Sequence, residues 1–216
     1  MRPLLQICGG MELAAFNNGA CMLLHVANAV LPEECPDVAT DSLCIWTIGH
    51  STHSIEQFIE LLQHYKLELL VDVRHFPGSR RLPHFNKEAM QVALMARGIR
   101  YEHLMELGGR RTPRPDSVNT AWRNTSFRGY ADHMETTAFR EGVDSLLELS
   151  QEHRTAIMCS EAVWWRCHRS MIADYLKVRG VEVIHILSLK SVQEHPYTSA
   201  ARLVDGALSY KGLLSD

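Results

Sequence analysis

From residue 44 onward, short apolar runs alternate with segments whose apolar residues recur at helical spacing. Short apolar runs bounded by turn residues are typical of buried strands. Strands that alternate with helices favour parallel pairing through right-handed crossovers. The pattern therefore predicts an α/β fold, a doubly wound, mainly parallel five-stranded sheet with helices on both faces in a Rossmann-like, three-layer arrangement. The expected strands are residues 44–48, 69–73, 99–104, 156–159 and 181–187.

Capping residues and glycines mark the expected helix boundaries. Ser54, followed three residues later by Gln57, forms a capping-box pattern before the first helix. Asn86 is expected to cap the second helix, Gly98 to end it, and Gly180 to end the last one. The other helical patterns cover residues 139–147 and 171–176.

Residues 44–190 are expected to form a single α/β domain. Residues 1–43 lack this periodicity and are interpreted as an N-terminal extension, poorly ordered or peripheral, and residues 191–216 as an irregular C-terminal tail. No stretch approaches the ~20 apolar residues of a membrane helix, so no membrane partner is expected. The six cysteines form no C-x-x-C pair and no regular framework, which is typical of a reduced, cytoplasmic protein. No pattern indicates an oligomeric state.

Positive charge is concentrated in the middle of the chain. Residues 74–128 hold ten arginines and one lysine against four acidic residues, a net charge of +7 within a chain whose total is −3. The chain has seventeen arginines and five lysines, and arginine suits bidentate contact with phosphate or carboxylate. The distribution predicts an anionic partner, a small molecule or a nucleic acid.

Polar, chemically active residues follow four of the five expected strands. In open α/β sheets, ligands bind beyond the carboxyl ends of the strands. We therefore expect these four clusters to converge on one site. They are residues 49–51 (GHS), 72–75 (DVRH), 106–111 (ELGGRR) and 159–161 (CSE).

A series of motifs between residues 44 and 190 resembles the bacterial domain-of-unknown-function family numbered 488. The resemblance covers most of the expected domain, with the motifs in the same order, but it implies no activity because the family is named for lacking one. The motifs are residues 47–51 (TIGHS), 71–77 (VDVRHFP), 79–81 (SRR), 85–87 (FNK), 107–110 (LGGR), 127–131 (FRGYA) and 159–169 (CSEAVWWRCHR).

The last motif places a thiol at a strand end and arginines at the start of a helix. Helix N-termini attract anions, and Arg166 and Arg169 would add to that attraction. In such surroundings Cys159 is expected to ionise readily and to react faster than an ordinary thiol. The layout is loosely similar to that of rhodaneses and cysteine phosphatases, although this loop lacks their glycines. Cysteine-dependent sulfur or phosphoryl transfer is therefore one alternative.

Two further interpretations of the same motif remain open. Cys159, Cys167 and His168 are a weaker alternative as zinc ligands, with His50 or His53 as the fourth. Cys159 can also be a small buried hydrophobic residue at a strand end.

Aromatic residues beside arginines predict a platform for base stacking. Trp164 and Trp165 lie beside Arg166, and Tyr130 lies beside the basic segment that ends at Arg128. The same composition is found in packed cores. The long Arg- and Pro-rich connection at residues 105–125 is expected to close over the site.

The leading hypothesis is an enzyme that acts on a phosphate-bearing substrate, a nucleotide or nucleic acid. A non-catalytic module that binds the same ligands is the main rival. The expected catalytic residues are His50, Asp72, Cys159 and Glu161. The expected substrate-binding residues are Ser51, Arg74, Arg110, Arg128, Tyr130, Trp164, Trp165, Arg166, His168 and Arg169.

Overall fold

A six-stranded, mostly parallel sheet forms the centre of the computed structural model, which describes residues 43–212. The extension predicted for residues 1–43 lies outside this range except for Leu43. The strand order is β3-β2-β4-β1-β5-β6, in which the first five strands run parallel and β6 is antiparallel to β5. The strands are β1 (Cys44–Gly49), β2 (Leu69–Asp72), β3 (Arg100–His103), β4 (Thr155–Cys159), β5 (Glu182–Ser188) and β6 (Ser191–Glu194).

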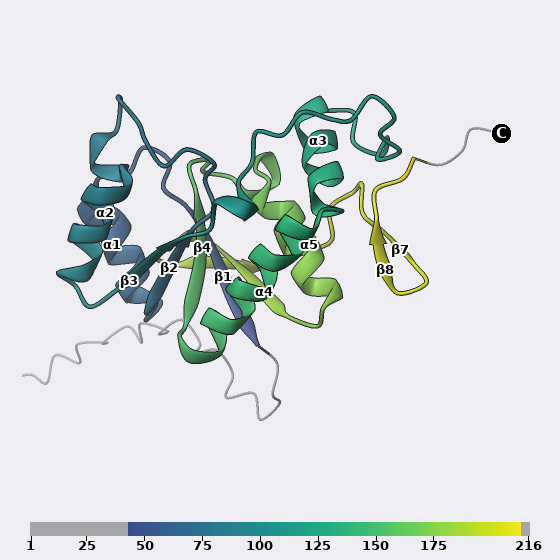
Figure 1. Ribbon diagram of the computed structural model, residues 1–216. Helices are drawn as coiled ribbons and strands as arrows, with labels where there is room; N and C mark the ends of the chain where they lie inside the picture. The colour runs from purple at the N-terminus through teal and green to yellow at the C-terminus, as the bar shows by residue number, and fades with distance from the viewer. Residues whose placement is uncertain (1–42, 213–216) are drawn as a thin grey trace, which may run out of the picture. The chain divides into compact units, whose positions relative to one another are not determined.

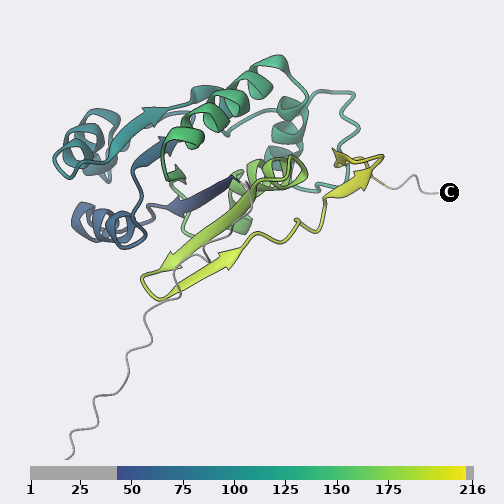
Figure 2. The same ribbon diagram turned by 90° about the horizontal axis from the view of Figure 1, so that it is seen from below.

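The prediction of five strands and an irregular tail was wrong after residue 190. β6 lies beside β5 at the edge of the sheet (Figure 2), and β7 (Arg202–Val204) and β8 (Ala207–Ser209) form a separate hairpin. β6 is mostly exposed, so it carries no apolar run that would indicate a buried strand. The Asp205-Gly206 turn, with φ of 50° and 77°, was the available signal for the hairpin.

Within residues 43–212, five helices accompany the sheet, and four of them were predicted. The Ser54–Gln57 capping box is present, and Gly98 and Gly180 follow their helices with φ of 72° and 79°. The helices are α1 (Ile55–His64), α2 (Lys87–Met95), α3 (Thr125–Met134), α4 (Thr137–Glu152) and α5 (Arg169–Val178). The unpredicted α3 begins where the Arg- and Pro-rich connection ends. No helix in residues 43–212 is long and apolar enough to cross a membrane.

Both faces of the sheet are covered. Figure 1 shows α1 and α2 on one side and α4 and α5 on the other. β2 and β4 are buried along their whole length, as strands covered on both faces must be. The register sets Gly49 beside Cys159 and Asp72 beside Met158, so the carboxyl ends of β1, β2 and β4 lie next to one another.

Candidate functional site

A cavity of about 810 Å³ opens where β1, β2 and β4 end. Its walls come from sequence-distant loops, as expected for polar clusters that follow parallel strands. A second cavity of about 330 Å³ lies beside the β7–β8 hairpin and contains none of the predicted site residues. The predicted residues that line the larger cavity are His50, Ser51, Arg74, Arg110, Tyr130, Cys159, Glu161, Arg166, Cys167 and His168.

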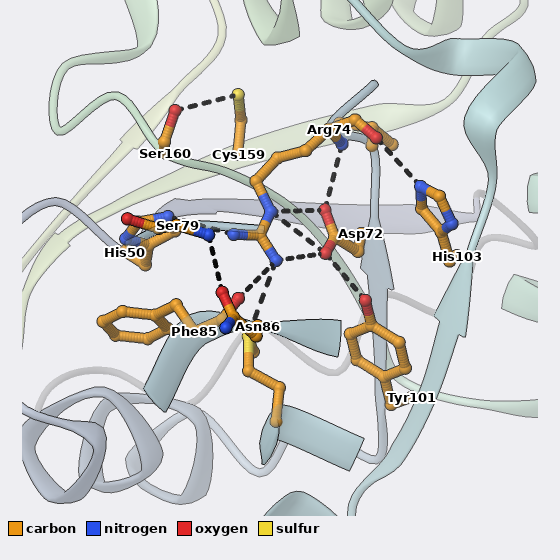
Figure 3. A network of polar contacts seen from close by, with 12 residues as sticks. His50, Asp72, Arg74, Ser79, Phe85, Asn86, Tyr101, His103, Cys159 and Ser160 are labelled. Carbon is orange, nitrogen blue, oxygen red and sulfur yellow. Dashed lines mark hydrogen bonds and ion pairs between the residues drawn. The ribbon is translucent and has the colours of Figure 1, made fainter. Parts of the chain in front are cut away.

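Asp72 does not line the cavity but lies beneath Arg74, and both side chains are buried. The Arg74 guanidinium donates to both carboxylate oxygens at 2.6–3.0 Å, and Tyr101 adds a bond from its hydroxyl at 2.7 Å. Arg74 also donates to the carbonyl of Phe85 at 2.8 Å. Figure 3 shows the guanidinium enclosed by these partners. The charges of Asp72 and Arg74 are therefore satisfied internally, and neither is available as a free catalytic or phosphate-binding group.

His50 is a neutral, buried imidazole. Its Nδ1 lies 3.0 Å from the carbonyl of Ser51, an acceptor only, so Nδ1 carries the proton. Nε2 then accepts from Arg74 Nη1 at 3.4 Å, and the ring stacks on Phe85 at 4.1 Å. Burial first, and then the charge of Arg74, lowers the pKa of His50 to about 4. At neutral pH this imidazole is a weak base with both nitrogens occupied.

The two thiols meet one imidazole on the cavity wall. Nδ1 of His168 lies 3.9 Å from the sulfur of Cys159 and 3.7 Å from that of Cys167. A hydrogen bond to Cys167 and burial raise the pKa of Cys159 to about 12. Burial also raises the pKa of Cys167, but the bond from Cys159 and the charge and backbone N–H of Arg169 outweigh it and lower that pKa to about 6. These contacts favour the thiolate of Cys167 over that of Cys159, so the ready ionisation expected of Cys159 stays a prediction.

Arg169 and Arg128 donate to groups within the protein and do not line the cavity. Arg169 is buried, and its guanidinium donates to the carbonyl of Glu161 at 2.7 Å and to the hydroxyl of Thr47 at 3.2 Å. Arg128 donates to the carbonyl of Trp122 at 3.2 Å through Nε and Nη2. These arginines hold loops in place, which sequence position alone cannot distinguish from ligand binding.

The tryptophans do not form the predicted platform in the cavity. Trp164 stacks on His185 with ring centroids 4.4 Å apart, and its indole N–H donates to Gln193. Trp165 is exposed, and neither indole lines the cavity. Tyr130 does line it, but its hydroxyl donates to the carbonyl of Leu107 at 2.8 Å.

Three arginines that line the cavity are free of partners. The side chains of Arg81, Arg110 and Arg166 are exposed, and within residues 43–212 they make no hydrogen bond or ion pair. Glu161 is the one carboxylate among the described lining residues. The cavity is therefore electropositive.

The sequence analysis placed His75 in one of the converging clusters but assigned it no role, and it did not select the lining residues Arg81 and Phe76. Arg81 belongs to the SRR motif and His75 and Phe76 to the VDVRHFP motif, so the signal was present. His75 Nδ1 is buried without a partner among the described residues, and Phe76 is 64% exposed. All three lie in the loop after β2, on the cavity wall.

Comparison with known families finds one match. The family model described as Domain of unknown function DUF488 matches residues 54–176, more than half of the chain. No curated protein and no solved structure matches the chain.

Proposed function

The chain belongs to the DUF488 family, whose name carries no activity, and we propose that it is an enzyme acting on a phosphate-bearing substrate, a nucleotide or nucleic acid. The proposal uses the doubly wound, Rossmann-like arrangement that we infer for the sheet. In such sheets the ligand binds beyond the carboxyl ends of the strands, which is where the 810 Å³ cavity lies.

The observation that carries the proposal is the set of three unpaired arginines around one cavity. Among the described lining residues, Glu161 is the one carboxylate beside Arg81, Arg110 and Arg166, so the lining keeps an excess of positive charge. Guanidinium groups bind phosphate oxygens in pairs of parallel hydrogen bonds. Arg110 also has φ of 58°, a strained backbone for a non-glycine residue, and such strain is often found at functional sites.

The size and rim of the cavity favour a nucleotide over a duplex. Small-molecule sites are typically ~300–1,000 Å³, and this cavity falls within that range. Phe76 lines the cavity and is well exposed, so its ring is available to stack on a base. It takes the role that the sequence had suggested for Trp164 and Trp165.

We assign the chemistry to the segment from Cys159 to His168, which also carries Arg166. Glu161 is exposed and lines the cavity, so its carboxylate is accessible for general acid–base work. The cluster of Cys159, Cys167 and His168 lies in the same segment. We also keep as a prediction the cytoplasmic location suggested by the cysteine pattern.

Calorimetric titration with a nucleoside diphosphate and with inorganic pyrophosphate at low salt tests the substrate class. Replacing Arg81, Arg110 or Arg166 by Ala should each weaken binding about tenfold or more, because a charge-assisted hydrogen bond contributes roughly 1.5–3 kcal/mol. Arg97→Ala is the matched control, because that exposed arginine lies before β3, at the opposite end of the strands. The affinity should fall as salt rises. Absence of binding at low salt, or equal loss in the Arg97 variant, contradicts the proposal.

Turnover separates the enzyme from a non-catalytic binding module. An enzyme should convert a bound nucleotide or phosphate ester, and Glu161→Gln should abolish conversion while affinity stays within a few-fold. A module should bind with the same arginines and convert nothing. Asp72 cannot serve as a probe here, because removing its carboxylate leaves Arg74 buried without its counter-ion.

A further inference from the structure

Three side chains on the cavity wall direct metal-ligating atoms toward one point. The sulfurs of Cys159 and Cys167 and a ring nitrogen of His168 all lie within 4.8 Å of one another. All three residues line the cavity, although they come from the end of β4 and the start of α5. A thiol pair with an imidazole is a ligand set that prefers zinc to the oxygen-seeking cations.

The spacing of these atoms is close to that of a tetrahedral zinc site. Zn–S bonds of ~2.3 Å and Zn–N bonds of ~2.0–2.1 Å at tetrahedral angles place sulfur and nitrogen about 3.6 Å apart. The observed distances from His168 Nδ1 are 3.9 Å to Cys159 and 3.7 Å to Cys167. The two sulfurs of a tetrahedral site lie ~3.8 Å apart. Because the three ligand atoms lie within 4.8 Å of one another, movements of up to about 1 Å would complete the coordination.

The orientation of His168 is fixed from behind. Its Nε2 lies 2.9 Å from the carbonyl oxygen of Val73, which can only accept, so Nε2 carries the proton. The lone pair of Nδ1 is then directed at the two sulfurs. Ligating histidines in metalloproteins are held in this way by a backbone carbonyl or a carboxylate.

The site has three protein ligands and an open side. No fourth His, Cys, Asp or Glu joins the cluster within residues 43–212, and His50 is engaged with Ser51 and Arg74. A Cβ on Gly109 would lie 2.8 Å from His168 Nδ1, so the glycine leaves room beside the ligands. Three protein ligands and one open position are typical of catalytic zinc, whereas structural zinc has four.

We propose that Cys159, Cys167 and His168 bind one zinc ion whose fourth position faces the cavity. The ion would hold a water molecule or a substrate oxygen there and polarise it. This site goes beyond the proposed substrate class and does not depend on it, because it rests on the ligand geometry alone.

Metal analysis and cobalt substitution of the full chain test the site. The wild-type protein, purified without chelator, should contain about one zinc per chain. After zinc removal, Co²⁺ should give the thiolate charge-transfer absorption and the intense visible bands of a tetrahedral site. This readout needs no variant, so it stands even if the substituted proteins fold poorly. A protein that takes up no zinc, or a cobalt spectrum without thiolate bands, overturns the proposal.

Variants locate the ion. Cys159→Ser, Cys167→Ser and His168→Gln should each lower zinc affinity at least tenfold, measured by competition with a chromogenic chelator. The matched control changes the other four cysteines together, Cys8, Cys21, Cys35 and Cys44, to Ser, and it should retain the full zinc content. Zinc that is lost in this control and kept in the cluster variants overturns the assignment. Pyrophosphate binding is measured separately, so absence of zinc and absence of a phosphate site are distinct results.

Discussion

His50 should make the protein sensitive to mild acid, and His50→Gln should remove that part of the sensitivity. The imidazole is 3% exposed and neutral, with its pKa lowered from 6.5 to about 4 by burial and by Arg74. In the unfolded chain it takes up a proton near pH 6.5, whereas in the folded chain it does not until about pH 4. The unfolded state therefore binds more protons between these values, so the stability falls as the pH falls through this window.

The size of the effect follows from the two pKa values. If His50 is protonated in the unfolded state but not in the folded state, the free energy of unfolding falls by at most about 3 kcal/mol, at ~1.4 kcal/mol per unit of pKa difference. Between pH 7 and pH 5 the linkage relation gives a loss of about 2 kcal/mol from this residue. Glutamine keeps an acceptor for Arg74 and a donor for the Ser51 carbonyl but does not titrate.

The assay is urea denaturation of the wild type and His50→Gln at pH 7 and pH 5, with a chelator present so that metal release does not contribute. Other groups, including His185, whose pKa is also lowered by burial, affect both proteins alike and cancel in the difference. The wild type should lose about 2 kcal/mol more than the variant between the two pH values. Equal losses would refute the assignment of His50 as a neutral buried base.

Three other substitutions have defined outcomes. Asp72→Asn should lower the free energy of unfolding by about 3–5 kcal/mol, measured by urea denaturation, because it leaves Arg74 buried without a counter-ion. Gly109→Ala should weaken zinc binding in the chelator competition, because the added Cβ would lie 2.8 Å from His168 Nδ1 and displace the ring. Trp165→Ala should leave nucleotide affinity and stability unchanged within experimental error, because this exposed indole does not line the cavity. A loss of nucleotide affinity would instead support the original prediction that Trp165 stacks on a base.

The fold was predictable where burial imposes a pattern. The five parallel strands and four helices were found because each buries a continuous or periodic apolar surface. β6 was not predicted because a strand that pairs at the edge of a sheet can be polar, as its sequence SVQE is. α3 was not predicted because it follows a long irregular connection, although the Asn124 side chain caps it by accepting hydrogen bonds from two backbone N–H groups.

The location of the site was predictable, but the state of its residues was not. Parallel strands bring residues 49–51, 72–75 and 159–161 to one edge whatever the side chains do. Whether a charged side chain at this edge is free to bind a ligand depends on whether residues from elsewhere in the chain pair with it. Tyr101 on β3 and the Phe85 carbonyl complete the Asp72–Arg74 pair, and neither contact has a signature in the sequence around Arg74.

The arginines therefore divide into two groups with different physical roles. Arg74 and Arg169 are buried and donate to a carboxylate, a hydroxyl and backbone carbonyls, so they fix the loops that shape the cavity, although Nε of Arg169 has no partner among the described residues. Arg81, Arg110 and Arg166 remain exposed and unpaired within the described residues. Removing a buried arginine should thus lower stability first and binding as a consequence. Removal of an exposed one should lower binding alone, and this separation would identify the three as the ligand-binding group.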